Sequence, residues 1–475
     1  MNIALPAIQH AFSLSRTDLQ WVVTSFALPF GGFMLVGGRA ADLYGPRRVF
    51  LAGIVAFIVS SLTASVSVSG LMLVIARASE GLSGAAMEPA ALALLVTSFR
   101  QGVDRNRALA INGSMLSAGF VSGLLVGGAL TTLVSWRAVF LVNLPIGCLM
   151  AVFASRSAVE EGPRAEERSL DVAGAVSATV AALAFMYAVA AFGDEGHATQ
   201  GVAVGLCTCA VLIGCFLIIE VRASAPLVPG RLAGDRSVVA GSVAALLVSA
   251  SVVGMIFLLT LYLQQGLGYT PINTAFILAG LGVAAMVSGA QAARIVARWG
   301  ARRVLLTALA VQAGGAVDLA RVTSHGSLAL VVPGTVLTGC GFVLALVAST
   351  IVVTGSVADV DQGAASGFLN AAIELGAGLG VATLVAVATV TSGHLASGSR
   401  TPGHAAQIAN GTRHGMAAAA LLVLCAAVAS LFIRRDQGQP AGSTGSKRHQ
   451  AALGETRDAG DTVRVEGNLR LPDSS

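Results

Sequence analysis

Long apolar runs recur along the chain, and short polar segments separate them. The first two runs, 21–37 and 49–73, are each long enough for a membrane-spanning helix, which needs about 20 apolar residues. Runs of this kind predict membrane helices at 19–41, 48–69, 70–98, 107–133, 136–156, 171–192, 201–221, 238–263, 272–293, 303–321, 328–355, 363–391 and 414–433. The pattern therefore predicts an all-α polytopic membrane protein.

Polar connections divide these helices into groups. Residues 157–170 and 222–237 are charged, and we expect a cytoplasmic linker at each. This division predicts an N-terminal helix bundle over 1–156, two extra central helices over 171–221 and a C-terminal helix bundle over 238–433.

Composition supports a membrane protein. The 475 residues are 55% hydrophobic and 11% charged, whereas a soluble domain is about 25% charged, and the mean hydropathy is +0.79. The tail 434–475 is rich in Gly, Ser and charge, and we expect it to be disordered because it cannot bury enough apolar surface to fold. The net charge of +5 comes from arginines at helix ends and a single lysine, Lys447, so it does not indicate nucleic-acid binding.

The arginines alternate along the chain between two sets of loops. Cytoplasmic loops collect Lys and Arg, so the richer set predicts a plasma (inner) membrane protein with a cytoplasmic C-terminus. That set holds Arg39, Arg47, Arg48, Arg100, Arg105, Arg107, Arg156, Arg164, Arg168, Arg222, Arg231, Arg236, Arg294, Arg298, Arg302, Arg303, Arg434 and Arg435. The opposite set holds Arg16, Arg137, Arg321, Arg400 and Arg413.

Enzyme and cofactor signals are absent from the sequence. No G-x-x-x-x-G-K-[ST] loop and no His-rich cluster occurs, and the six cysteines lie in apolar runs without His or carboxylate neighbours. We therefore expect no enzyme activity, no metal and no cofactor, and a protein that works from an ion gradient.

A short charged turn joins the first two predicted helices. Gly38, Asp42, Gly45, Arg47 and Arg48 form the pattern G-x-x-x-D-x-x-G-x-R-R, which resembles the loop between helices 2 and 3 of the major facilitator superfamily of secondary transporters. Charges at this position can bridge two helix bundles in one conformation and separate in the other. The resemblance implies a conformational latch; the alternative is a turn that serves only as a topology signal.

The same turn recurs in the second half of the chain. Residues 294–303 repeat the pattern, with Gly300 in the place of Gly45 and Ala297 in the place of Asp42. Alternating-access transporters are built from repeated halves. With two helices between the halves, the repeat implies the major facilitator fold in a 6+2+6 arrangement.

Two further strings narrow the resemblance. W-R-x-x-F-x-x-N-x-P, at 136–145, is similar to the start of helix 6 in the 14-helix drug:proton antiporters, and N-x-A-L-P, at 2–6, is similar to the outer end of their helix 1. We therefore expect the first helix to be mostly missing from this sequence, either because the true start lies upstream of Met1 or because the helix is lost. The acidic residue of that helix has no counterpart here.

The helix over 70–98 carries three charges within the membrane. Arg77, Gly84 and Glu88 fall on one face and Glu80 lies nearby, and charged residues inside a membrane normally face a cavity or a partner. Arg77-x-x-Glu80-Gly81 resembles the R-x-x-Q-G motif of the family, whose arginine is associated with proton coupling. Arg77, Glu80 and Glu88 are thus candidates for proton coupling; the alternative is a static Arg77–Glu80 pair with Glu88 near the interface.

Glycines follow one stripe of the helix over 107–133. Gly119, Gly123, Gly127 and Gly128 resemble the antiporter motif G-x-x-x-G-P-x-x-G-G, with Leu124 in the place of its proline. Small residues on one stripe let helices pack closely and slide. We expect a role in helix packing or in gating.

The helix over 363–391 supplies the candidates of the second half. Asn370 and Glu374 lie one turn apart on one face. Glu374 is a candidate for proton or cation binding and Asn370 for lining the cavity, whereas Asp318 is expected at the interface.

The resemblance implies a proton-coupled exporter of hydrophobic or cationic drugs and similar small molecules, working by alternating access in the lipid bilayer. One alternative is a dedicated exporter of a single metabolite or antibiotic. Another is a non-transporting remnant or sensor, which would fit the incomplete first helix and the changed residues Ala297 and Leu124.

Overall fold

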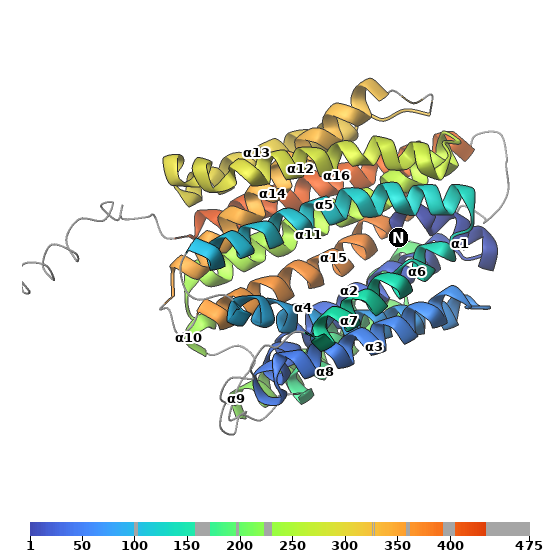
Figure 1. Cartoon of the computed structure of the whole chain (residues 1–475). Helices are drawn as coiled ribbons and strands as arrows, with labels where there is room; N and C mark the ends of the chain where they lie inside the picture. The colour runs from blue at the N-terminus through green and yellow to red at the C-terminus, as the bar shows by residue number, and fades with distance from the viewer. Residues whose placement is uncertain are drawn as a thin grey trace, which may run out of the picture. The chain divides into compact units, whose positions relative to one another are not determined.

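The computed structural model describes residues 1–98, 103–156, 172–195, 199–222, 230–324, 326, 328–357, 362–392 and 404–433. Within these residues the chain is helical and forms no strand, which confirms the predicted all-α membrane fold (Figure 1). The expected linker 157–170 and the tail 434–475 lie outside the described residues. Of the expected linker 222–237, the described part includes the short helix α10 and the start of α11.

The N-terminal half begins with two short helices and continues with mostly longer ones. Its elements are η1 (Asn2–Ala4), α1 (Leu5–Phe12), α2 (Arg16–Tyr44), α3 (Pro46–Ser65), α4 (Gly70–Ser98), α5 (Val103–Leu133), α6 (Ala138–Leu141) and α7 (Asn143–Arg156). The predicted helix 136–156 is therefore broken in two near Val142. Pro145 lies in the first turn of α7, where its missing N–H costs no helical hydrogen bond, so a new helix can start there.

The remaining helices follow in two groups. The central ones are α8 (Val172–Glu195), α9 (Gln200–Arg222) and α10 (Gly230–Ala233). The C-terminal half contains α11 (Arg236–Leu261), η2 (Tyr262–Gly266), α12 (Pro271–Trp299), α13 (Ala301–Leu319), α14 (Leu328–Gly355), α15 (Gln362–Ser392) and α16 (His404–Leu431). The last helix starts ten residues before the predicted 414, because a polar stretch there continues the helix beyond its apolar part.

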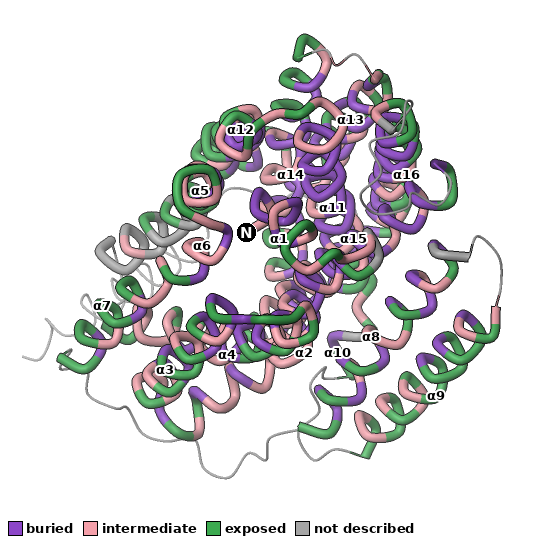
Figure 2. The backbone as a smooth tube through the Cα atoms, turned by 90° about the vertical axis from the view of Figure 1, so that its right-hand side faces the viewer, coloured by how far each residue is buried: buried purple, intermediate pink, exposed green. Residues whose placement is uncertain are grey.

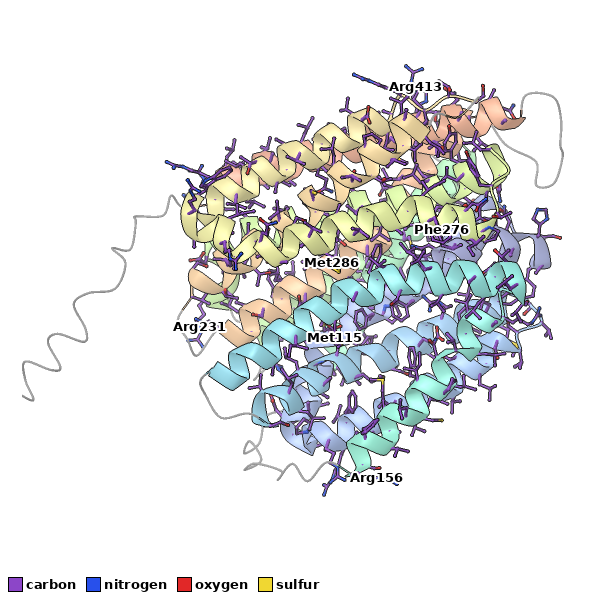
Figure 3. All side chains as sticks on the ribbon, turned by 45° about the horizontal axis from the view of Figure 1, so that its top comes forward. Met115, Arg156, Arg231, Phe276, Met286 and Arg413 are labelled. Carbon is purple, nitrogen blue, oxygen red and sulfur yellow. The ribbon has the colours of Figure 1, made fainter. Side chains whose placement is uncertain are left out.

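Most of these helices can cross a membrane. Among the described residues, 11 helical segments are long and apolar enough to do so. Helices α5 and α13 fall outside that set, yet α5 packs against α12 and α13 packs against α14. Apolar side chains such as Phe276 (63% exposed) and Met115 (68% exposed) cover the outer flanks of α12 and α5, as lipid-facing side chains do (Figure 3).

Each half has its own helix contacts, and the halves meet along two seams. In the N-terminal half α4 packs on α2 and α3, and in the C-terminal half α11 packs on α15 and α16. The seams between the halves are α2 against α15 and α5 against α12. Helix α8 contacts both α2 and α15, and α9 contacts α8, so the two extra helices lie beside the first seam (Figure 2).

Small residues allow the closest of these contacts. A side chain at Gly81 of α4 would collide with the carbonyl of Phe26 of α2, and one at Gly380 of α15 would collide with the carbonyl of Ala250 of α11. Backbones therefore touch directly within each half, as small residues permit in membrane helices.

The two charged turns have the same geometry. Gly45 and Gly300 adopt φ of 92° and 83°, a backbone region that glycine alone enters readily, and each ends one helix and begins the next. Beyond the turn, Arg47 Nε donates to the carbonyl of Ala154 at 3.0 Å, and Arg302 Nη2 donates to the carbonyl of Leu431 at 3.1 Å. The sequence repeat is thus a structural repeat, in which an arginine ties each hairpin to the last helix of its own half.

The arginine-rich loops that the structure describes lie at one end of the bundle. Helices α2 and α15 are antiparallel, since Leu35 contacts Gly367 and Leu28 contacts Gly378. The hydrogen bonds of Arg47 and Arg302 place the C-terminal ends of α7 and α16 beside the two charged turns. We call this the arginine-rich end; Arg156 and Arg231 project from it in Figure 3. The opposite, arginine-poor end carries Arg137, which donates to the carbonyl of Ser67 at 2.9 Å.

The N-terminal half contains a groove where the C-terminal half contains a helix. Helix α11 is deeply buried among α14, α15 and α16. The corresponding helices α4, α5 and α6–α7 enclose a groove of about 330 Å³ that Arg77, Gly119, Gly123 and Asn143 help to line. Residues 1–12, where the sequence predicts the remnant of helix 1, form η1 and α1 and do not span the membrane.

Candidate functional site

Arg77 of α4 is held by three groups in the N-terminal half. Its Nη1 lies 2.5 Å from Oε2 of Glu80, one helical turn along, and its Nε donates to the carbonyl of Val22 at 3.1 Å. The guanidinium also lies over the ring of Phe26, 4.4 Å from the centroid. The predicted Arg77–Glu80 pair is present, and the contacts of Arg77 with Val22 and Phe26 fasten α4 to α2.

Glu80 is fully buried, and both of its carboxylate oxygens have partners. Ser61 Oγ of α3 donates to Oε1 at 2.5 Å, while Arg77 binds Oε2. Asn143 Nδ2 of α7 donates to Ser61 Oγ at 3.2 Å. The resulting network joins α2, α3, α4 and α7. A buried ion pair with this many hydrogen bonds offsets the cost of removing both charges from water.

Sequence reasoning missed the partners of this pair. Ser61 and Phe26 are ordinary residues of apolar helices and give no signal by themselves. Asn143 belongs to the string W-R-x-x-F-x-x-N-x-P, where it served only as a family marker. A polar residue at the broken start of a membrane helix was a signal that it has a buried partner.

The other two candidate carboxylates come from different halves and face the same region. Glu88 is exposed on α4, one turn beyond Gly84, which packs on the ring of Phe30. Glu374 is partly buried on α15, where its Cβ lies against Gly31 of α2. The charge of Glu88 acts on Glu374, and neither forms a hydrogen bond or ion pair with any described residue. The structure thus brings together two unpaired carboxylates that are 286 positions apart (374 − 88) in the chain.

Asn370 lies one turn before Glu374, and it too forms no hydrogen bond within the described part of the chain. Nearby, Gly367 packs against Leu35 of α2, and Gly363 is exposed at the start of α15. The first seam between the halves therefore carries an amide and a carboxylate whose hydrogen-bonding groups remain available to a ligand.

The residues of the predicted latch occupy the α2–α3 hairpin. Gly45 makes the turn, Gly38 lies against Pro89 of α4, and Arg47 anchors the hairpin to α7 within the same half. Arg47 also donates to the carbonyl of Ser155. Asp42 and Arg48 take part in interactions as well. The contacts of Gly45, Gly38 and Arg47 all lie within the N-terminal half.

The glycine stripe of α5 divides into two parts. At Gly128 a side chain would meet Ala275 and the carbonyl of Pro271 at 2.6 and 3.1 Å, so this glycine permits close packing against α12. No described atom lies within 4 Å of a Cβ built at Gly119 or Gly123, and the nearest at Gly127 is the Met1 nitrogen at 3.8 Å. Those three glycines line the N-terminal groove, so in this conformation Gly128 alone among the four packs against a neighbouring helix.

No cluster of three or more His, Cys, Asp or Glu side chains that could hold a metal occurs among the described residues. The six cysteines are free thiols on helices; Cys209 is buried, Cys340 is partly buried and the others are exposed.

Comparison with known proteins assigns the family. The Major Facilitator Superfamily profile matches residues 1–381 and 243–465. The chain is 35% identical to the cephamycin export protein CmcT of Amycolatopsis lactamdurans, covering 91% of this chain and 87% of that protein. It is 33% identical to the puromycin resistance protein pur8 of Streptomyces alboniger, covering 94% and 90%.

A solved structure supports the same fold. A bacterial homologue of the human lysosomal transporter Spinster, in an inward-facing and unoccupied conformation, matches with a TM-score of 0.64 at 17% identity, covering 93% of this chain and 94% of that one. With its helical repeat and its intramembrane charges, the chain belongs to the major facilitator superfamily of membrane transporters, in the branch that exports drugs and antibiotics.

Proposed function

We propose that the protein exports hydrophobic or cationic small molecules across the plasma membrane in exchange for protons, by alternating access. The observation that carries this proposal is the pair Glu88 and Glu374, two carboxylates from opposite halves that have no partner among the described residues and of which the first acts electrostatically on the second. An unpaired carboxylate inside a membrane is costly, and a proton or a bound cation removes that cost. Proton and cationic substrate can therefore compete for the same two groups.

The Arg77–Glu80 network has a different part in this scheme. Its two charges offset each other, and Ser61 donates a hydrogen bond to the other carboxylate oxygen, so the network offers a proton no unpaired oxygen. We assign the network to holding α4 against α2 and α3, which keeps Glu88 in its place on α4. Glu80 remains a coupling candidate only if the Arg77–Glu80 pair separates during transport.

Hydrogen bonds between the halves support an assignment of the conformation. Gln264 Nε2 donates to the carbonyl of Ile3 at 2.9 Å, Gln265 Nε2 donates to Oε1 of Gln9 at 2.6 Å, and the N–H of Ile272 donates to Thr132 Oγ1 at 3.1 Å. All three lie at the arginine-poor end. We propose that this end is closed here and faces outward in the cell, with the C-terminus on the cytoplasmic side as the arginine distribution predicts.

A dedicated antibiotic exporter is the second candidate. The names of the two relatives each refer to one antibiotic, cephamycin and puromycin. Profiling export of a panel of dyes and antibiotics separates the candidates: movement of one compound supports the dedicated exporter, and movement of many supports a multidrug exporter. A protein that moves none would support the non-transporting sensor.

The test of coupling uses inverted membrane vesicles that hold the full chain. We expect a fluorescent cationic dye to accumulate inside when the interior is acidified, and accumulation to stop when a protonophore collapses the gradient. Glu374→Gln and Glu88→Gln should each abolish accumulation, whereas Asp318→Asn, at the arginine-poor end beside Arg321, should leave it intact. Accumulation that survives the protonophore, or that both glutamine variants keep, would show that proton exchange at these carboxylates is not the mechanism.

A further inference from the structure

The outer face of the C-terminal half contains a basic groove next to the α12–α13 hairpin. Two adjoining hollows, of about 360 and 520 Å³, share Arg298, Trp299 and Thr307. The first also includes Arg294 and Leu344, and the second also includes Arg303. We call the surface formed by these six residues the hairpin groove.

Three arginines of the hairpin groove have no partner among the described residues. Arg294 and Arg298 lie one turn apart on α12, and Arg303 lies in the first turn of α13. Within the described part of the chain none of the three donates a side-chain hydrogen bond or joins an ion pair. Arg302, between them in sequence, differs because it is bound to the carbonyl of Leu431. The groove thus presents three exposed guanidinium groups.

No carboxylate on the surrounding helices balances these charges. Over α12, α13 and α14 the one acidic residue is Asp318, which lies at the far end of α13 and faces Arg321. Fifteen residues of helix separate it from Arg303, about 22 Å at 1.5 Å per residue. Among the described residues of α12, α13 and α14, the three arginines therefore have no counter-charge near them.

The rest of the lining is apolar and leads toward the middle of the membrane. Below the arginines it consists of Ile295, Val304, Ala308, Val311 and Leu344. Val311 is 37% exposed, so the apolar surface is open to the lipid side. A ligand with a hydrocarbon chain below a charged group fits this order, whereas a free anion would use only the upper part.

Trp299 fixes the level of the groove in the bilayer. It is the last residue of α12, it is 53% exposed, and its indole lies beside Arg298 and Arg303 in the lining. Tryptophan is enriched at the membrane–water interface, where lipid headgroups and glycerol lie. The arginines are therefore at the height of phosphate groups and Val311 is at the height of acyl chains.

We propose that the hairpin groove binds an anionic phospholipid, with its phosphate on Arg294, Arg298 and Arg303 and one acyl chain along Val311 and Leu344. Guanidinium groups bind phosphate oxygens in pairs, and basic pockets between membrane helices on the cytoplasmic side bind anionic headgroups. The lipid supplies the missing counter-charge of the C-terminal hairpin. It would therefore be part of the working transporter, as a ligand distinct from the substrate.

Quenching of Trp299 by brominated lipid measures this binding directly. The full chain is reconstituted in phosphatidylcholine with increasing fractions of brominated phosphatidylglycerol or brominated phosphatidylcholine. The signal of Trp299 is the difference between wild type and Trp299→Phe, which removes the contributions of Trp21 and Trp136. We expect half-maximal quenching at a several-fold lower fraction of the anionic lipid, and equal quenching by the two lipids would overturn the proposal.

Variants then assign the preference to the arginines. One basic residue near an anionic lipid is worth about fivefold in affinity, so Arg298→Gln should lower the preference by about that factor. Arg222→Gln, at the end of α9 and outside the groove, is the control and should leave it unchanged. A preference that Arg298→Gln and Arg303→Gln both retain would overturn the proposal.

Native mass spectrometry of wild-type protein adds a measurement that does not depend on the folding of a variant. We expect the protein to retain phosphatidylglycerol over phosphatidylcholine, and equal retention of the two lipids would contradict the site.

A free phosphate ion is the competing source of the same chemistry. Adding millimolar inorganic phosphate to the vesicles, with sodium chloride at the same ionic strength as a control, distinguishes the two. The lipid preference should persist, because the acyl chain holds the lipid in place. If phosphate alone abolishes it, the groove is a phosphate site and the assignment to a lipid is wrong.

Discussion

At the scale of single residues, the three membrane carboxylates and the one arginine of the candidate site divide by whether they have partners. Glu80 and Arg77 satisfy each other and draw in Ser61, Asn143 and the carbonyl of Val22. Glu88 and Glu374 have no such partners in the described part of the chain. Substitution should therefore affect stability in the first pair and transport in the second.

We predict that Glu80→Ala destabilises the protein strongly. It leaves the buried Arg77 charge without its counter-ion, and breaking a buried pair costs about 3–5 kcal/mol. Glu80→Gln should cost less, since an amide can still accept a hydrogen bond. Thermal unfolding of purified protein measures this, with Glu88→Ala as the matched control that should change little. A large loss in the control but not in Glu80→Ala would contradict the division.

The same residues show what the sequence could predict. The Arg77–Glu80 pair was predictable because residues three apart on a helix are neighbours. Ser61 and Asn143 were not, because they reach Glu80 from helices that are distant in sequence, and nothing local marks them as its partners. The approach of Glu88 to Glu374 depends on how the two halves pack against each other, and the sequence of a single helix does not predict that packing.

At the scale of helices, the length of each apolar run predicted the membrane-spanning helices. The alternation of arginine-rich and arginine-poor loops predicted which helix ends lie together. Both patterns can be read from a short stretch of sequence, because the bilayer acts on each helix and loop directly. The α2–α3 and α12–α13 hairpins repeat each other in backbone conformation as well as in sequence. Gly45 and Gly300 share a backbone conformation, and Arg47 and Arg302 share a role. The break between α6 and α7 was not predicted, although Asn143 and Pro145 stand at it in the sequence.

We predict that Gly45→Ala and Gly300→Ala each destabilise the protein by about 1–3 kcal/mol, because a side chain is strained at their positive φ. Gly314→Ala, within α13 where a Cβ meets nothing within 4 Å, is the control and should be neutral or slightly stabilising. Midpoints of thermal unfolding compare the three. If Gly314→Ala is as harmful as the hairpin variants, the effect is not one of turn conformation.

The α5 stripe allows packing and gating to be separated. Gly128→Ala would place its Cβ 2.6 Å from that of Ala275 in the other half, so it should hinder closure at the arginine-poor end. Gly119→Ala has open space and should be tolerated in this conformation. Dye efflux should fall several-fold in the first variant and little in the second. Equal loss in both would mean that Gly119 meets a partner in another state.

At the scale of the whole molecule, transport requires the seams between the halves to open at alternate ends. Glu374 lies at the α2–α15 seam and Glu88 acts on it from α4, while hydrogen bonds between the halves lie at the arginine-poor end. Helix α8 contacts α2 and α15 together, so the extra helices must follow or slide on both halves as they move.

Cross-linking the arginine-poor end tests that movement. The side chains of Gln9 and Gln265 meet at 2.6 Å across the halves, so Gln9→Cys with Gln265→Cys, in a background without the native cysteines, should be joined by a short bifunctional thiol reagent containing a disulfide. Transport should then stop, because the closed end cannot open, and it should return when the reagent is reduced. Tyr187→Cys with Gly201→Cys is the control. Its cross-link joins α8 to α9 and should leave transport intact, since those helices are neighbours within the central pair. Full transport with the first pair cross-linked would show that these contacts do not separate, and alternating access about this end would have to be abandoned.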